Sequence, residues 1–298
     1  MTGTQAASAL TRTENKNINK MLENNSLYTS LKWKHSAEGL DEENEMIPIV
    51  TDESSDDIDN IEVPESLPIL PLRNTVLFPG VVLPISVGRD KSLKLIREAY
   101  KKDKLLGAFA QHDPEEEDPT PDDIFERGTV GEILKLLEMP DGNTTVIIQG
   151  RIRCQLGEVY QEDPYMKGRV ELLSEELPRD EDAEFDALVS SVKDLALKII
   201  KISNHIPQEA SFAIKNIENP HFLVNFIASN TDIELKEKHN LLDINDLNQR
   251  GNKLLELLTM EVQKQELKND IQSKVKSELD QQQKEYLLNQ QMKTIQNE

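Results

Sequence analysis

The segment Leu70–Arg89 (LPLRNTVLFPGVVLPISVGR) most constrains the fold, because it is strongly apolar and yet cannot form a continuous helix. Its three prolines interrupt any helix, and the run is too short and too broken to span a membrane. Within it, Phe78-Pro79-Gly80-Val81 has the pattern of a type II turn, in which Pro79 fixes the second position and Gly80 supplies a positive φ at the third. The segment therefore predicts two strands joined by a tight structural turn at Pro79 and Gly80.

The strand pattern continues from Leu67 to Leu173, where short apolar runs are separated by turn signals. The prolines of LPILPL and VLPISV suit edge strands or strand ends, and residues 140–143 (PDGN) are a hairpin signal. One helix, KSLKLIREAYKK, interrupts the strands, and Asp90 is expected to cap it. About six closely spaced strands with one inserted helix predict a small closed or half-closed barrel.

After Pro178 the apolar residues follow the period of a helix. We expect a helix from Ala183 to Ile202, one that starts at Pro220 with Asn219 as its cap, and one whose capping box pairs Thr231 with Glu234. These short helices predict a compact bundle, so the fold class is α+β.

Residues 252–298 contain neither Gly nor Pro, which predicts a single helix of roughly 70 Å at 1.5 Å per residue. Its apolar stripe drifts around the helix, which favours docking on several surfaces over an ideal coiled coil. Because the stripe does not fade before Glu298 and no stop signal appears, we expect the chain to have been cut in mid-helix.

The formal net charge of −21 is concentrated in two segments. Residues 38–65 hold twelve acidic residues and residues 112–126 hold eight, both without Lys or Arg; the remainder has 35 acidic and 34 basic residues. No basic surface is expected, which argues against nucleic acid as the main partner. Residues 1–65 read as a disordered acidic arm, a solvated spacer rather than a binding site.

No catalytic, cofactor-binding or metal-binding residue is predicted in this chain. Nucleotide-binding, zinc-protease, nucleophile-elbow and Rossmann motifs are all absent from the sequence, and the five histidines lack metal-ligand spacing. Cys154, the only cysteine, is expected to be a small core residue and fits a reducing cytoplasm. Without a signal-peptide-like or membrane-spanning run, the protein is expected to be cytoplasmic, with no membrane partner.

Three stretches in order, LPILPLRNTVLFPGVVLPISVGRDKS, GTVGEILKLLEMPDGNTTVIIQGRIR and EYLLNQQMKTIQNE, resemble the amino-terminal region of the Lon family of ATP-dependent serine proteases. The resemblance implies a PUA-like β-barrel at 66–177, a helical bundle at 178–250 and a long helix at 251–298 that leads to an ATPase domain. It also implies that ATP, magnesium and the Ser-Lys dyad of the family belong to a missing part beyond residue 298.

The leading functional hypothesis is therefore substrate recognition and support of a homohexamer in a Lon-type protease. Its partners would be unfolded or damaged proteins, which the complete enzyme degrades together with regulatory proteins. The alternative is a stand-alone module that uses the barrel to bind a peptide or small ligand, and a third possibility is a structural adaptor built on the long helix.

Overall fold

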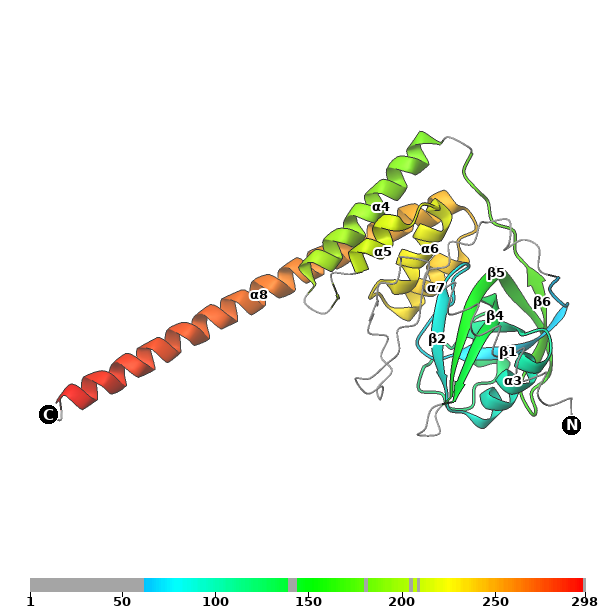
Figure 1. The fold of residues 1–298 in the computed structure, drawn as a ribbon, viewed down its shortest axis with the longest axis horizontal. Coiled ribbons are helices and arrows are strands. Elements are labelled where there is room, and N and C mark those ends of the chain that lie inside the picture. Colours follow the sequence, from blue (N-terminus) through cyan, green and yellow to red (C-terminus); the bar gives the residue numbers. More distant parts are fainter. Residues whose placement is uncertain (1–61, 139–143, 180–181, 204–205, 208–209, 297–298) are drawn as a thin grey trace, which may run out of the picture.

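The computed structural model describes residues 62–138, 144–179, 182–203, 206–207 and 210–296. A β-barrel leads into a helical region, from which helix α8 (Leu247–Gln296) projects far to one side (Figure 1). The α+β class and the long final helix are as predicted. The hairpin signal at 140–143 and almost all of the acidic arm lie outside the described residues.

Six strands form one mixed sheet in the order β2-β5-β4-β3-β1-β6. Because β5 also pairs with β6, β5, β4, β3, β1 and β6 close into a barrel, and β2 extends the sheet beside the first half of β5. Only β1 and β3 run parallel. The strands are β1 (Ser66–Leu72), β2 (Val82–Val87), β3 (Leu105–Ala110), β4 (Arg127–Glu138), β5 (Thr144–Gln161) and β6 (Lys167–Leu172).

Strand β5 combines two runs that the sequence pattern separates, TTVIIQG and RIRCQLGEVYQ. At their junction, a side chain on Gly150 would collide with the carbonyl oxygen of Phe78, so only glycine lets the two segments approach. The β4–β5 register shifts at the same place, between Val130 and Gly131. A glycine at such a shift bends a strand without ending it, which lets β5 curve around the barrel.

The prolines of the first two strands are accommodated differently. Strand β2, with Pro84, lies at the end of the sheet order, as predicted for an edge strand. Strand β1 lies inside the order, but its residues 66–68 pair with β6 and its residues 69–72 pair with β3. Each half of β1 thus has a paired strand on one side, so Pro68 and Pro71 can sit where no N–H is needed.

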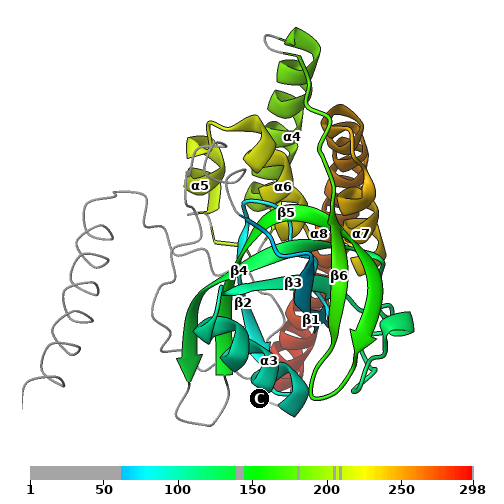
Figure 2. The ribbon, with the colours of Figure 1, turned by 90° about the vertical axis from the view of Figure 1, so that its right-hand side faces the viewer.

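The inserted helix α3 (Asp90–Lys101) packs on the barrel through Leu95, Ile96 and Ala99, at the end of the barrel away from the helical region (Figure 2). These residues belong to a core cluster that continues through the barrel into the helical region. A second, smaller cluster around Ile69, Phe109 and Val130 fills the rest of the barrel. One continuous core therefore crosses the predicted boundary at residues 177 and 178, and the boundary itself stays a prediction.

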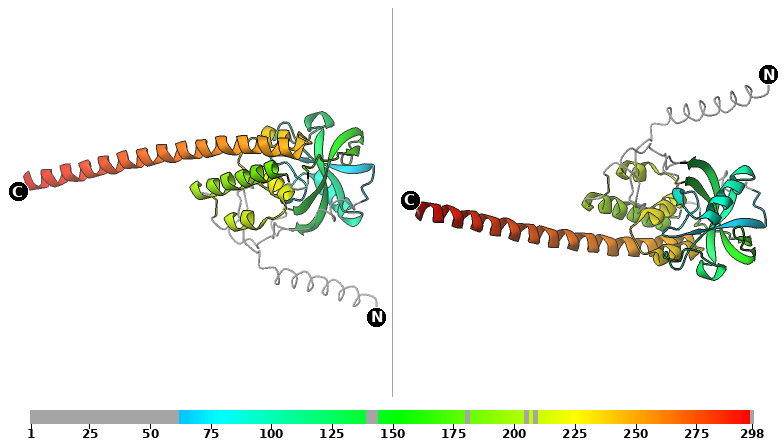
Figure 3. Two further views of the ribbon diagram at one scale, coloured as in Figure 1. Left: turned by 90° about the horizontal axis from the view of Figure 1, so that it is seen from above. Right: turned by 90° about the horizontal axis from the view of Figure 1, so that it is seen from below.

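Between β6 and α8 the described residues form four helices: α4 (Ala183–Ile202), α5 (Ala210–Asn216), α6 (Pro220–Asn230) and α7 (Leu235–Asp243). Helix α4 has the predicted bounds and lies beside the first part of α8 (Figure 3). The two helices are also linked by a Lys198–Glu266 ion pair and by a 2.9 Å bond from the Asn269 amide to Ile202 O. None of the described helices carries an apolar stretch of membrane-spanning length.

Of the three predicted caps, one has the expected geometry. Asn219 is the N-cap of α6, and its Oδ1 accepts a 3.2 Å hydrogen bond from Phe222 N. Asp90 is not a cap, because α3 starts one residue earlier with Arg89 as N-cap; Asp90 is the first helical residue, where its charge suits the helix dipole.

Thr231 also differs from the prediction, because it ends α6 instead of starting α7. Its Oγ1 donates a 2.7 Å hydrogen bond to Ile227 O, so the hydroxyl is committed to the preceding helix. Helix α7 begins only at Leu235, with Glu234 as an N-cap that makes no side-chain cap bond. The predicted capping box between Thr231 and Glu234 is therefore wrong.

We predict that Gly80→Val lowers the free energy of unfolding by about 1–3 kcal/mol. Gly80 has a φ of 78°, and a Cβ there would lie 2.9 Å from Cδ2 of Phe222. Chemical denaturation measures the effect. Gly88→Val is the matched control, because Gly88 has no atom within 4 Å of an added Cβ and no positive φ. If both variants lose the same free energy of unfolding, the assignment of a turn at Pro79 and Gly80 is contradicted.

Candidate functional site

The single cysteine has the environment of a core residue. Cys154 is buried in the smaller barrel cluster, and burial raises the pKa of its thiol to about 12. A thiol with such a pKa is protonated at neutral pH and is a poor nucleophile. The described residues also contain no group of His, Cys, Asp and Glu that could hold a metal ion.

Two histidines join the acidic loop after β3 to helix α7. The ring of Phe125 lies between them, with its centroid 4.1 Å from that of His112 and 3.9 Å from that of His239. His239 Nε2 lies 3.2 Å from Arg127 O and donates to it. Burial lowers the pKa of His239, so the folded protein favours its neutral form. His35 and His205 lie outside the described residues.

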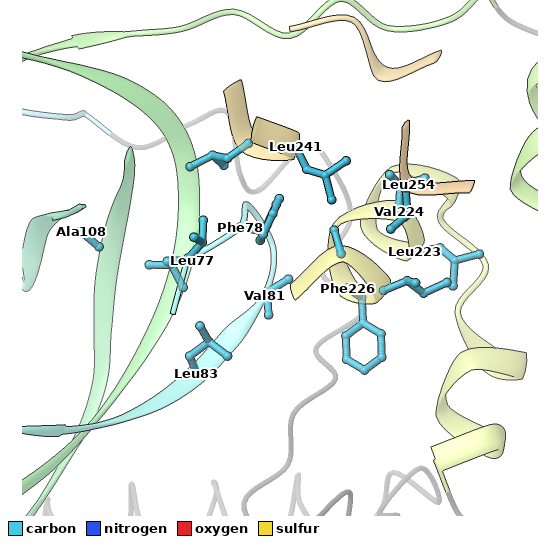
Figure 4. Packing of buried hydrophobic residues seen from close by; sticks show 14 of the residues in the cluster. Leu77, Phe78, Val81, Leu83, Ala108, Leu223, Val224, Phe226, Leu241 and Leu254 are labelled. Atoms are coloured by element: carbon cyan, nitrogen blue, oxygen red, sulfur yellow. The ribbon is translucent and has the colours of Figure 1, made fainter. Parts of the chain in front are cut away.

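The predicted turn at Pro79 and Gly80 lies at the junction of the barrel and the helical region. Val81 N donates a 3.2 Å hydrogen bond to Phe78 O, which closes the turn. The turn then docks on α6, where Asn225 Nδ2 donates to Pro79 O at 3.3 Å and the Phe222 ring lies against Gly80. Its apolar neighbours meet side chains of α6, α7 and α8 (Figure 4).

A cluster of buried charges lies at the same junction. Arg153 of β5 and Arg250 of α8 are at most 2% exposed, and both reach one carboxylate, Glu175, in the segment that follows β6. The Nη1 of Arg250 pairs directly with Glu175 Oε1, and Arg153 Nε lies 3.7 Å from the same oxygen. His221 of α6 lies 3.3 Å from the other carboxylate oxygen. We call Arg153, Glu175 and Arg250 the charge cluster.

Main-chain carbonyls accept further hydrogen bonds from the two arginines of the charge cluster. Arg153 Nη1 donates to Leu242 O and Ile244 O, at 3.0 and 3.1 Å, and Arg250 Nη2 donates to Ile244 O at 2.6 Å. Both arginines thus bind the connection between α7 and α8. Burial, and then the nearby Arg250, lowers the pKa of Arg153 to about 10, so it stays charged at neutral pH. The charge cluster can therefore fix the geometry of the junction.

A small cavity of about 80 Å³ lies at the start of α3. Apolar side chains of Ile69, Leu95 and Met166 line it, together with the ion pair of Lys91 and Asp118. The volume is close to that of a few water molecules, so it cannot hold a nucleotide.

The apolar stripe of α8 divides into a buried and an exposed part. Leu258 and Val262 are buried in the core that α8 shares with the other helices. Further along, a series of large apolar side chains is at least half exposed where α8 extends away from the other described elements (Figure 3): Leu267, Ile271, Val275, Leu279 and Tyr286. The site therefore offers apolar surface and a rigid junction.

Comparison with known proteins identifies the family. The sequence profile described as the ATP-dependent protease La (LON) substrate-binding domain matches residues 66–260. The chain belongs to the Lon substrate-binding-domain family. The Lon protease of Flavobacterium johnsoniae is 56% identical over 263 residues, which cover 88% of this chain and 32% of that protein. The Lon protease of Cytophaga hutchinsonii is 46% identical over 254 residues, covering 85% and 31%.

A solved structure agrees at the level of the fold. The N-terminal domain of the Mycobacterium avium complex Lon protease superposes with a TM-score of 0.53 at 22% identity, covering 65% of this chain and 98% of that one. The chain spans about a third of the length of these curated relatives.

The sequence pattern did not point to the charge cluster of this Lon-type domain. Arg153 alternates with Ile152 and Cys154, a pattern that predicts a charged side chain on the solvent face of a strand. Glu175 and Arg250 each lie in a polar stretch of sequence, which also carries no sign of burial.

We predict that Glu175→Gln lowers the free energy of unfolding by about 3–5 kcal/mol, because it leaves two buried arginines without a counter-charge. Denaturant titration measures the change. The matched control is Glu256→Gln, which breaks an exposed pair with Lys253 and is expected to change stability by less than about 1 kcal/mol. If Glu175→Gln and Glu256→Gln lower the free energy of unfolding by the same amount, the charge cluster does not hold the junction.

We also predict that the protein loses stability as the pH falls below about 6.5, the ordinary pKa of histidine. His239 has a lowered pKa in the folded state, so the unfolded chain binds more protons between that pKa and the ordinary one. The stability that the protein gains by keeping His239 neutral is thus fully present above pH 6.5. It declines as the pH falls further, until the pKa of His239 in the folded state is reached. Melting temperatures from pH 5 to 8 test this, and His239→Phe, which preserves the ring contact with Phe125, should flatten the decline. An unchanged pH profile in this variant would assign the effect to other groups.

Proposed function

We propose that this chain is the substrate-recognition and hexamer-supporting region of a Lon-type ATP-dependent serine protease, and that it binds unfolded or damaged proteins. The observation that carries the proposal is the match of residues 66–260 to a domain described as substrate-binding. The 56% identity to a Lon protease along 88% of the chain supports the same assignment.

The geometry is consistent with a recognition role. Exposed apolar side chains, such as Phe212 on α5 and Ile271 on α8, are surface features that bind apolar segments of other proteins. Unfolded proteins display such segments in no fixed sequence, whereas folded proteins bury them. The charge cluster holds barrel and helices in one arrangement, so this surface is presented on a rigid body.

In this proposal the chemical steps belong to the two thirds of the relatives' length that this chain does not span. Binding and hydrolysis of ATP with magnesium, and cleavage by a Ser-Lys dyad, are expected there. Six copies of the recognition region in a homohexamer would raise the avidity for a client, so each single contact can stay weak and reversible.

We predict that the protein binds a permanently unfolded client with a Kd in the micromolar range or weaker, corresponding to about −8 kcal/mol at most. Binding should change little between low and high salt, because apolar burial is not screened by ions. Fluorescence titration with a labelled client measures both. The folded form of the same client is the control and should bind at least tenfold more weakly. Equal binding of the two forms, or loss of binding in high salt, would refute the proposal.

A further inference from the structure

Strand β2 has an open edge. It is the last strand in the sheet order, with β5 along one side and no described strand along the other. Its sequence, VLPISV, contains no charged residue, and charges are the usual means by which proteins keep such edges from pairing. Pro84 and Ser86 are exposed, so solvent reaches this part of the strand.

The register shows which backbone groups face the open side. Gly80 N donates to Gly150 O at 2.8 Å, and Gly150 N donates to Val81 O at 2.9 Å, which sets the hydrogen-bonded pairs of the β2–β5 ladder. Hydrogen-bonded and non-hydrogen-bonded pairs alternate along an antiparallel ladder. Residues 83, 85 and 87 are therefore the ones that form main-chain hydrogen bonds with residues 148, 146 and 144 of β5. The C=O groups of Val82, Pro84 and Ser86 and the N–H groups of Val82 and Ser86 therefore point outward, and Pro84, which has no N–H, falls where β5 requires no donor.

We propose that the open edge of β2 binds an extended segment of unfolded polypeptide as an added antiparallel strand. This inference rests on the proposed function and assigns it a site. The exposed part of the edge offers the N–H of Ser86 and the carbonyl oxygens of Pro84 and Ser86, all of which bond to main-chain groups; the outward groups of Val82 are buried. Every unfolded protein carries these groups whatever its sequence, and a folded protein has already paired them. The chemistry thus selects for the unfolded state.

Pro84 favours a foreign strand over a second copy of β2. If two copies paired antiparallel about their centres, the two prolines would face each other and the central pair would lose both hydrogen bonds. A client strand loses only the bond that Pro84 cannot donate, because the client N–H still reaches Pro84 O. The short strand also keeps the contact weak, since the net contribution of each such hydrogen bond to binding is small.

Two substitutions with opposite expected effects test the proposal. Ser86→Pro removes an outward N–H and should weaken binding of the unfolded client about three- to tenfold relative to Ser86→Ala, which loses the same hydroxyl and keeps the N–H. Pro84→Val adds an outward N–H at an exposed position and should tighten binding by a similar factor. Melting temperatures of all variants show whether they are folded.

A second measurement leaves the protein unchanged. A short unfolded client peptide is compared with the same peptide carrying N-methyl groups at alternate residues, which removes the N–H groups that would bond to β2. The N-methylated peptide should bind the wild-type protein at least tenfold more weakly.

The outcomes separate this proposal from the function on which it rests. Binding of the unmodified client by the wild-type protein, with equal affinities for both peptides and all variants, would overturn the edge site and leave client recognition intact. No client binding by the wild-type protein would overturn both. Dimerisation of the wild-type protein that Ser86→Pro abolishes, seen by sedimentation, would assign the edge to a second copy and also overturn the proposal.

Discussion

The arrangement of this molecule depends on two buried arginines that share one carboxylate. Apolar contacts alone would let the barrel and helices slide, because burial of apolar surface has no preferred direction. Arg153 and Arg250 accept only a geometry in which Glu175 and the carbonyls of the α7–α8 connection are all within reach. Any other packing would leave a charge unpaired in the interior, which costs several kcal/mol. The charge cluster therefore selects one docking arrangement from many that the shared core would tolerate.

This junction also affects the open edge of β2. The strand follows directly on the Pro79–Gly80 turn, which is bonded to β5 through Gly150 and to α6 through Asn225. The start of β2 is thus fixed from two sides, and its outward backbone groups keep a constant position. A rigid edge loses less conformational entropy when a partner strand is added, which makes a short strand usable as a binding element.

Much of the fold could be predicted because the information was local. The turn at Gly80, the strand runs, the helix Ala183–Ile202 and the cap at Asn219 each follow from neighbouring residues. The errors at Asp90 and Thr231 were also local. Both residue types are common helix caps, but α3 begins at Asp90 itself and α7 begins only at Leu235. A capping box does form at Thr120 and Asp123, at the start of the 3₁₀ helix η1 (Pro121–Asp123), where the prediction had only an acidic loop. The charge cluster could not be predicted, because its members come from distant segments and a polar residue carries no sign of being buried.

The length of α8 gives the junction a mechanical role. Beyond Asn269, which bonds to the end of α4, the helix continues to Gln296, roughly 40 Å at 1.5 Å per residue. A rotation of about 5° at the root of such a rod displaces its tip by roughly 3–4 Å. Because the Asn269 bond and the Lys198–Glu266 ion pair hold α8 against α4, a force on the distal end acts first at the end of α4 and reaches the junction at Arg250 through the packed first part of the helix. The projecting part of α8 is therefore a lever, with its fulcrum where α4 ends.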